Sequence, residues 1–165
     1  MDKCLVSGSY DPITNGHLDI IRRVSNMFDI VIVGVFNNEE KEHMFNLNER
    51  VQMCKIATAD MKNVQVFGYD DMLYEVCVKN NITHIVRGFR DNKDYAYETE
   101  MAVFNFEHCG VMTCLLPSNK ALDNISSSKV RELLYNIDKE GNRLSTYIND
   151  DVLCEIRRIK NARFS

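Results

Sequence analysis

Several cationic and hydroxyl side chains in this sequence could together bind a chain of phosphates. They comprise one histidine, two lysines, two arginines, two separate hydroxyl residues and a run of three serines: His17, Lys41, Lys129, Arg87, Arg90, Ser9, Thr14 and Ser126–Ser128. Guanidinium groups hold phosphate oxygens through paired hydrogen bonds, and lysine supplies a point charge. Serines at the start of a helix add hydroxyl and N–H donors where the helix dipole favours an anion. These residue types predict a polyphosphate site.

Each of these groups also has an ordinary structural explanation when it is taken alone. Ser126–Ser128 would serve as a helix N-cap, and His17 as a surface or capping histidine. Lys41 stands among glutamates, and Glu98 would face solvent from the middle of a helix. No GxSxG elbow supports a nucleophilic serine, and neither GxxxxGK(S/T) nor GxGxxG is present. The case for a site therefore depends on whether the fold brings these groups together.

The stretch from Ser7 to His17 has the composition of a phosphate-binding loop. A short apolar run precedes it, and a helical pattern follows with apolar residues on one face: Ile20, Ile21, Val24, Met27 and Phe28. Open α/β sheets bind ligands at the carboxyl ends of their strands, where a helix N-terminus offers unpaired N–H groups. We expect His17, in or near the first helical turn, to face a bound anion.

The apolar pattern predicts five short strands that alternate with helices. We expect strands at residues 4–6, 30–35, 64–67, 83–86 and 111–116, and helices after the first loop, at 48–59, 72–80 and 94–107, from 126 onward, and at 150–161. Continuous β-branched runs such as 30–35 suit strands that are buried on both faces. Without repeats or low-complexity linkers, this alternation predicts an α/β fold with a doubly wound five-stranded parallel sheet, Rossmann-like, in a single domain over residues 1–165.

Most of the chemically interesting residues follow the carboxyl ends of the predicted strands. Right-handed crossovers place all of these ends at one edge of a parallel sheet. That edge would gather the opening loop, residues 36–41, residues 69–72, the loop Arg87–Arg90 beyond the fourth strand, and the serine run. This coincidence is the main argument from the residues for a functional site.

Composition limits the class of protein. The chain has 165 residues, of which 45% are hydrophobic and 27% charged, as in soluble globular proteins. Its net charge of −4 argues against broad binding of nucleic acid. No apolar run approaches the ~20 residues of a membrane span, and the amino terminus lacks a signal-peptide pattern. Six scattered cysteines without a CxxC spacing predict mostly buried, reduced thiols and a reducing cytoplasm.

Two motifs resemble the signatures of the nucleotidyltransferase superfamily. Residues 14–17, Thr-Asn-Gly-His, are similar to its (T/H)xGH signature, and residues 125–131 to its second signature, about 110 residues later. Four blocks narrow the resemblance to the phosphopantetheine adenylyltransferases of bacterial coenzyme A synthesis: residues 8–21, Met44-Phe45 with 49–51, 87–90 through 94–98, and 116–118 with the serine run.

That resemblance implies transfer of the adenylyl group of ATP to 4′-phosphopantetheine, which gives dephospho-coenzyme A and pyrophosphate by in-line displacement without a covalent intermediate. It assigns catalysis to His17, Lys41 and Ser9. It implies ATP contacts from Ser9, Tyr10, His17, Gly88, Phe89, Arg90, Glu98, Asn124, Ile125, Ser126, Ser127 and Ser128. It implies phosphopantetheine contacts from Ser9, Lys41, Met72, Leu73, Arg87 and Asn105. Mg²⁺ is implied as the assisting ion, with no protein ligand predicted.

The resemblance further implies a cytoplasmic homohexamer that coenzyme A inhibits, with no nucleic-acid or membrane partner. Three segments depart from the common pattern of the family. Ser9-Tyr10 replaces the usual Thr-Phe, and the serine keeps the hydroxyl group. The segment before Met44 is more acidic than the usual lysine-rich version, and the loop before Ile125 is one residue longer than the pattern.

Two other functions remain open at this point. One is another enzyme of the superfamily, such as a nicotinate-mononucleotide adenylyltransferase or a cytidylyltransferase, although residues 11–17 and the blocks at 87–98 match the phosphopantetheine enzymes. The other is a non-catalytic nucleotide-binding module on the same fold, since a fold does not fix a function. A degenerate module should have lost His17 or the serines, and both are present.

Overall fold

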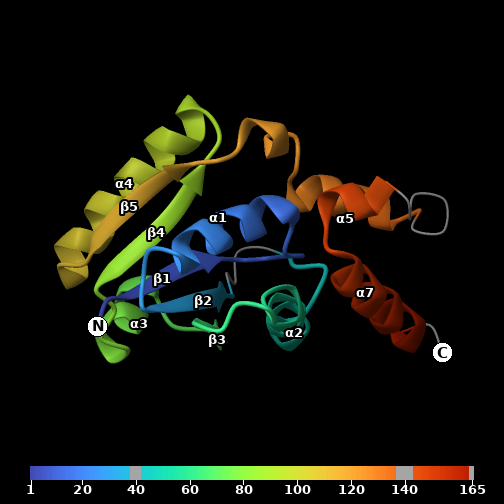
Figure 1. Ribbon diagram of the computed structural model, residues 1–165, viewed down its shortest axis with the longest axis horizontal. Coiled ribbons are helices and arrows are strands. Elements are labelled where there is room, and N and C mark those ends of the chain that lie inside the picture. Colours follow the sequence, from blue (N-terminus) through green and yellow to red (C-terminus); the bar gives the residue numbers. More distant parts are fainter. Residues whose placement is uncertain (38–41, 137–142, 164–165) are drawn as a thin grey trace.

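The computed structural model describes residues 1–37, 42–136 and 143–163, and its centre is a five-stranded sheet in the order β3-β2-β1-β4-β5 (Figure 1). The strands are β1 Lys3–Gly8, β2 Ile30–Phe36, β3 Val64–Tyr69, β4 His84–Phe89 and β5 Met112–Pro117. Each strand is parallel to its neighbours. The prediction of an α/β fold built on a doubly wound, five-stranded parallel sheet is confirmed.

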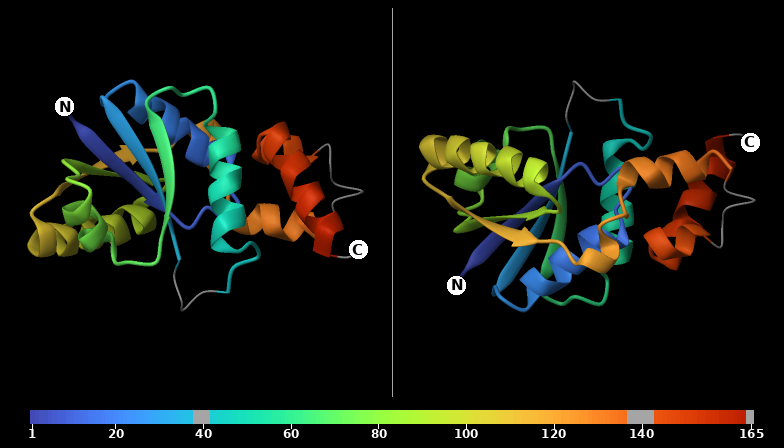
Figure 2. Two further views of the ribbon diagram at one scale, coloured as in Figure 1. Left: turned by 90° about the horizontal axis from the view of Figure 1, so that it is seen from below. Right: turned by 90° about the horizontal axis from the view of Figure 1, so that it is seen from above.

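The helices cover both faces of the sheet (Figure 2). They are α1 Asn15–Ser25, α2 Leu47–Ala57, α3 Leu73–Lys79, α4 Asn92–Cys109, α5 Ser127–Leu134 and α7 Asp150–Arg163, with a short 3₁₀ turn at Lys120–Leu122. In β1, Cys4 and Val6 pack into the core shared with α1, α2 and the C-terminal helices, whereas Leu5 packs into the core beneath α3. This alternation follows from the two-residue period of a strand whose two faces are both buried.

Strands β1 and β4, which are neighbours in the sheet, separate toward their carboxyl ends, as Figure 1 shows. β1 pairs with β4 only from Cys4↔His84 to Val6↔Val86. Beyond that point β1 stays with β2 as far as Gly8, while β4 stays with β5 as far as Phe89. The chain winds away from β1 in one direction and returns at β4 in the other, so this gap is the topological switch point where α/β sheets bind ligands.

Several predicted element boundaries are wrong. β1 continues to Gly8 rather than residue 6, β3 continues to Tyr69 rather than 67, and α4 runs from Asn92 to Cys109 rather than from 94 to 107. The fourth strand does not end at residue 86, because Arg87, Gly88 and Phe89 continue to pair with Leu115–Pro117 of β5, so only Arg90 of the predicted loop lies beyond the strand. Pro117 does not stop the fifth strand but is its last residue, a position that an edge strand tolerates.

The C-terminal helix reaches back to the segment that precedes α2. Arg163, in the last turn of α7, donates to the Met44 carbonyl at 3.1 Å and pairs with Glu49. Its guanidinium carbon lies 5.7 Å from the centre of the Phe45 ring, a cation–π distance. The last described residue is therefore bonded to a segment more than a hundred positions earlier.

The six cysteines are all free thiols. Cys4, Cys54 and Cys77 are buried as expected, and Cys109 and Cys114 are partly buried. Cys154, in α7, is exposed, so the expectation of mostly buried thiols does not extend to it. Among the described residues, no helix combines the length and apolar character that a bilayer crossing requires.

Candidate active site

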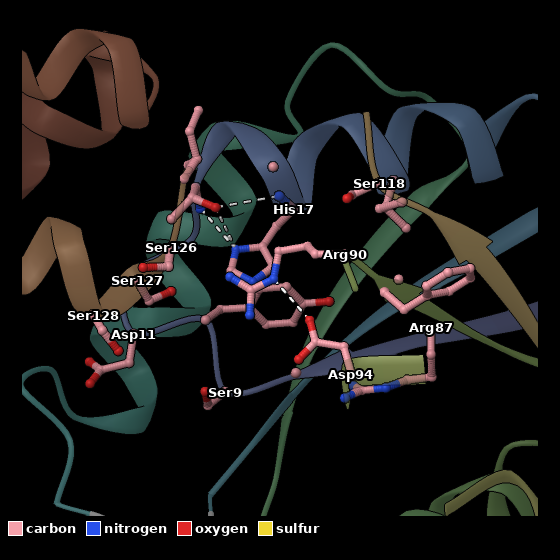
Figure 3. A pocket seen from close by; sticks show the side chains of 18 of the residues that line it. Ser9, Asp11, His17, Arg87, Arg90, Asp94, Ser118, Ser126, Ser127 and Ser128 are labelled. Carbon is pink, nitrogen blue, oxygen red and sulfur yellow. Dashed lines mark hydrogen bonds and ion pairs between the residues drawn. The ribbon is translucent and has the colours of Figure 1, made fainter. Parts of the chain in front are cut away.

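A cavity of about 490 Å³ opens where β1 and β4 separate (Figure 3). Six parts of the chain line it: the end of β1 with the loop after it, the first turns of α1, residues 42–43, the end of β4 with the first half of α4, the segment after β5, and the start of α5. In Figure 3, Ser126, Ser127 and Ser128 lie along one side, Arg87 lies opposite, and His17 stands between them. The fold thus brings together groups that are up to 119 residues apart in sequence, from Ser9 to Ser128.

His17 is held at the start of α1 by a reciprocal capping interaction. The Thr14 backbone N–H donates to His17 Nδ1 at 3.0 Å, and the Thr14 hydroxyl accepts from the His17 backbone N–H at 3.4 Å. Because Nδ1 accepts a hydrogen bond from a backbone donor, the proton of the neutral ring must lie on Nε2. Nε2 is therefore the ring atom that can donate to a ligand in the cavity.

The surroundings of His17 favour its neutral form. Burial in the cavity wall, followed by the positive charges of Arg87 and Arg90, lowers the pKa of His17 to about 4. The Tyr10 ring meets the imidazole edge-on, with 5.0 Å between the ring centres. His17 is consequently a neutral hydrogen-bond donor at pH 7 rather than a cation.

The serine run caps α5 and also provides hydroxyl groups. Ser126 is the N-cap, and its Oγ accepts from the Lys129 N–H at 3.2 Å. Ser127 donates its hydroxyl to the Pro12 carbonyl at 2.8 Å, and Ser128 Oγ accepts from Arg131 at 3.0 Å. The capping explanation is thus correct for Ser126, while the helix N-terminus still faces the cavity with the positive end of its dipole.

Arg87 and Glu98 form a largely buried ion pair in the cavity wall. Arg87 Nε and Nη2 donate to the two carboxylate oxygens of Glu98 at 2.8 and 2.7 Å. Arg87 Nη1 also donates to the carbonyl and hydroxyl oxygens of Ser7. Burial alone would lower the pKa of Arg87, but its hydrogen bonds and charge interaction with Glu98 raise it. Glu98 is only 7% exposed, so it does not face solvent as a mid-helix carboxylate would by default.

A second cavity of about 350 Å³ adjoins the first. The two share a wall made of Ser7, Gly8, Ser9, Arg87, Tyr97 and Glu98. Beyond that wall, the second cavity is lined mainly by apolar side chains, Leu73 from α3 and Met101 and Ala102 from α4, together with Phe36. Asn105 and Thr113 are the polar residues of this part. Ser9 therefore stands between a polar, cationic cavity and a more apolar one.

The sequence-predicted residues distribute over both cavities. The first cavity is lined by Ser9, Tyr10, His17, Gly88, Phe89, Arg90, Ile125, Ser126, Ser127 and Ser128, and the second by Leu73 and Asn105, while Arg87 and Glu98 border both. Asn124 and Met72 line neither, and the Met72 side chain is 55% exposed at the start of α3. Lys41 lies outside the described residues, so its role stays a prediction.

The cavity also contains charged residues to which the sequence assigned no role. Arg131 donates to the Asp11 carbonyl at 2.7 Å, and Asp94 accepts from Arg90 at 2.9 Å. Asp11 is buried, and its carboxylate accepts the backbone N–H groups of Met44 and Phe45, both at 2.9 Å. Arg131 had a sequence signal, because it falls inside the second signature. The contacts of Asp11 had none.

Of the four described carboxylates that line the cavity, the three other than Glu42 are engaged by protein donors. Asp11, Asp94 and Glu98 each accept hydrogen bonds from backbone or arginine N–H groups. Within residues 1–37, 42–136 and 143–163, no three His, Cys, Asp or Glu side chains gather as a metal-binding group. A cation at this site would therefore take most of its oxygen ligands from a bound substrate and from water, with Glu42 as the one lining carboxylate that has no protein donor among the described residues.

Comparison with known proteins identifies relatives of this chain. A family described as cytidylyltransferase-like matches residues 5–133. The phosphopantetheine adenylyltransferase of Streptomyces coelicolor is 40% identical over 133 residues, which cover 81% of this chain and 84% of that protein. The enzyme of the same name from Cutibacterium acnes is 40% identical over 134 residues, or 81% of this chain and 85% of the relative.

A solved structure from Vibrio parahaemolyticus, provisionally described as a nicotinate-nucleotide adenylyltransferase, has a similar fold. It superposes with a TM-score of 0.66 at 17% identity and covers 96% of this chain and 93% of its own. At that identity the likeness concerns the fold alone. It agrees with the doubly wound sheet described above.

Proposed function

This chain belongs to the cytidylyltransferase-like family and, within it, to the phosphopantetheine adenylyltransferases, and we propose on that basis that it transfers the adenylyl group of ATP to 4′-phosphopantetheine. An oxygen of the acceptor phosphate attacks the α-phosphorus of ATP, and the bond from that phosphorus to the bridging oxygen of the β-phosphate breaks. Dephospho-coenzyme A forms and pyrophosphate leaves with the bonding electron pair. The chain is a nucleotidyltransferase that acts in coenzyme A synthesis.

The observation that carries the proposal is the meeting of two unlike cavities at Ser9. The first cavity, with its cationic and hydroxyl side chains and two helix N-termini, suits the triphosphate of a nucleotide. The second, with Leu73, Met101 and Ala102, suits the uncharged arm of the acceptor, and Asn105 adds a polar partner for its amides. A phosphorylated arm bound in the second cavity would meet the phosphates of a nucleotide bound in the first at their shared wall, as adenylyl transfer requires.

The residues of the first cavity match the needs of the displacement. The acceptor phosphate is already anionic at pH 7, so the reaction requires no general base and consists of positioning and charge stabilisation. His17 Nε2–H donates to the α-phosphate as charge builds on its oxygens. A neutral donor suits this task, because it strengthens its bond in the transition state without holding the ground state as tightly as a cation would.

The other predicted residues take the parts that their positions allow. Ser9 orients the attacking phosphate, Arg87 binds the acceptor side, and Arg90 with Ser126–Ser128 holds the β- and γ-phosphates. Lys41 is assigned to the incoming phosphate from the family resemblance alone. Mg²⁺, when bound to phosphate oxygens and water, would supply further neutralisation of the triphosphate charge, which fits a cavity where Asp11, Asp94 and Glu98 are already engaged.

The proposal also covers the oligomeric state, the cellular location and the inhibition of the enzyme. An assembly of identical subunits, a hexamer by the family resemblance, is supported by the exposed aromatic side chains of α4, which are Tyr95, Phe104 and Phe106. Six free thiols support a cytoplasmic location. Inhibition by coenzyme A is supported by its chemistry, because its adenylate and pantetheine parts match the two adjoining cavities in turn.

The test is an assay of pyrophosphate release from ATP with Mg²⁺ and a panel of acceptors. We expect release with 4′-phosphopantetheine and none with nicotinate mononucleotide, choline phosphate or unphosphorylated pantetheine. Release with nicotinate mononucleotide and not with phosphopantetheine would reassign the substrate within the superfamily. ATP binding without turnover of any acceptor would indicate a non-catalytic module.

A further inference from the structure

Arg50, in the first half of α2, is a charged side chain that is completely buried. Four of its five N–H groups have partners. Nε donates to the Phe45 carbonyl at 3.0 Å, and Nη1 donates to the carbonyls of Ser9 at 2.8 Å and Phe36 at 2.9 Å. Nη2 donates to Asn37 Oδ1 at 2.8 Å. One side chain thus joins the loop after β1, the end of β2 and the segment before α2.

Stability alone does not account for a charge at this position. All four acceptors of Arg50 are uncharged, three of them backbone carbonyls. Burying charged groups is costly, and replacing a buried ion pair by apolar side chains of similar volume is often neutral or stabilising. What a guanidinium adds is a rigid fork that fixes several acceptors relative to one another. What Arg50 provides is therefore a fixed position of its four acceptors relative to one another.

The backbone next to Ser9 has to be held in an unfavourable conformation. Tyr10 has a positive φ of 47°, and left-handed backbone costs a residue with a β-carbon about 1–2 kcal/mol. The Tyr10 side chain is buried, and its hydroxyl donates to the Val6 carbonyl at 3.0 Å. Such strain persists where surrounding contacts fix it, and it is concentrated at functional sites. Arg50 binds the carbonyl of the peptide that directly precedes Tyr10.

Asp11 completes a closed ring of contacts around this turn. Its carboxylate accepts the N–H groups of Met44 and Phe45, and Arg50 takes the Phe45 carbonyl. The ring runs from Ser9 through Arg50 and Phe45 to Asp11 and back along the chain through Tyr10. Both ends of the strained turn are therefore fixed to the same short segment, and the exposed Ser9 side chain is directed to the wall between the two cavities.

We propose that Arg50 is a positioning residue for the transfer reaction, which acts through Ser9 by holding the Tyr10 turn, an inference that rests on the proposed function. Arg50 is too deeply buried to touch substrate. A shift of about 1 Å in a group that orients the nucleophile can lower the rate 10²-fold. Loss of Arg50 is therefore expected to lower kcat more than it raises either KM.

The test is a double-mutant cycle in kcat between Arg50→Lys and Ser9→Ala. Lysine keeps the charge but cannot span four acceptors, and we expect a kcat loss of about 10- to 100-fold in the otherwise unchanged protein. If Arg50 acts through Ser9, the same substitution should cost less than about 3-fold once Ser9 is alanine. An equal loss in both backgrounds would overturn the proposal, and so would full kcat in Arg50→Lys.

A control and a second variant separate positioning from folding. Met53→Ala removes a fully buried side chain from the same helix that does not line either cavity. It should lower Tm as Arg50→Lys does, with kcat per folded molecule unchanged. If Arg50→Lys fails to fold, Asn37→Ala is the second variant, because it removes one acceptor of Arg50 at an exposed residue. We expect it to lower kcat about 2- to 5-fold when Ser9 is present and to have no such effect when Ser9 is alanine. Activity of the unchanged protein with phosphopantetheine tests the proposed function separately.

Discussion

Arg87 on β4 and Glu98 on α4 are joined by two hydrogen bonds across the wall that the two cavities share. Eleven residues separate them in sequence, and the loop between strand and helix brings them face to face. The charge of Arg87 is therefore balanced before any phosphate arrives. Four of its five N–H groups are already bonded to Glu98 and Ser7, so in the proposed reaction Arg87 would recognise its ligand by the fixed direction of the remaining one rather than by an excess of charge.

Loss of this partner should destabilise the fold. Removing one member of a fully buried pair costs 3–5 kcal/mol, and because the Arg87 side chain is 29% exposed we expect Glu98→Ala to lower the free energy of unfolding by about 2 kcal/mol. Urea denaturation at pH 7 measures it. Asp60→Asn, which breaks an exposed pair with Arg22, is the matched control and should cost less than about 1 kcal/mol. Equal effects of the two substitutions would contradict a buried role for the Arg87–Glu98 pair.

Replacement of His17 should affect the rate far more than the binding of ATP. His17→Ala removes the Nε2–H donor, and we expect kcat to fall by about 10²-fold or more. His17→Gln retains a side-chain N–H donor and should recover part of that loss. Steady-state kinetics gives kcat, and calorimetric titration gives the affinity for ATP. A parallel loss of affinity and kcat would mean that His17 acts on the ground state.

The titration of His17 should be displaced to acid pH. Its pKa is about 4 in the folded protein against 6.5 for the ordinary side chain, so between these values the unfolded chain binds more protons than the folded one. The free energy of unfolding should therefore fall as the pH decreases from 6.5 toward 4. NMR of the imidazole protons measures the midpoint, with His17→Gln identifying the resonance. A midpoint near 6.5 would show that the ring is not desolvated.

Filling the second cavity should impair the use of the acceptor alone. Ala102 lines only that cavity, and Ala102→Phe would place an aromatic ring in the space assigned to the pantetheine arm. We expect KM for phosphopantetheine to rise at least about 10-fold, the cost of roughly 1.4 kcal/mol in binding, with KM for ATP unchanged. Ala121→Phe, at an exposed residue that lines neither cavity, is the control. If KM for ATP rose instead, the second cavity would have to be reassigned to the nucleotide and the first to the pantetheine arm.

The sequence predicted the architecture because its strands are apolar and its helices are amphipathic. It failed at the end of β4, because Arg87 and Gly88 have the polarity and flexibility of a loop. What keeps them in the strand is the pairing with β5, which depends on residues almost thirty positions later. When the end of a strand is set by pairing with a neighbouring strand, the residues at that end need not show a strand pattern themselves.

The site was predictable where function depends on residue type and hidden where it depends on contacts with the backbone. The serines and His17 can be found from their motifs. Glu98 looked like a charge on a solvated helix face, yet it pairs with Arg87, and nothing in the sequence indicated that Arg50 would bind carbonyl oxygens. A carbonyl acceptor is present at every position of any chain, so no residue pattern could indicate which of them Arg50 would take.

The bond between the end of α7 and the segment before α2 has a practical consequence for handling the protein. Carboxypeptidase trimming that reached Arg163 would remove its hydrogen bond to Met44, its ion pair with Glu49 and its contact with Phe45. Met44 and Phe45 are also the residues whose N–H groups hold Asp11. A preparation trimmed through Arg163 in storage would thus be altered beside the first cavity, and intact mass should be verified before kinetic constants of variants are compared.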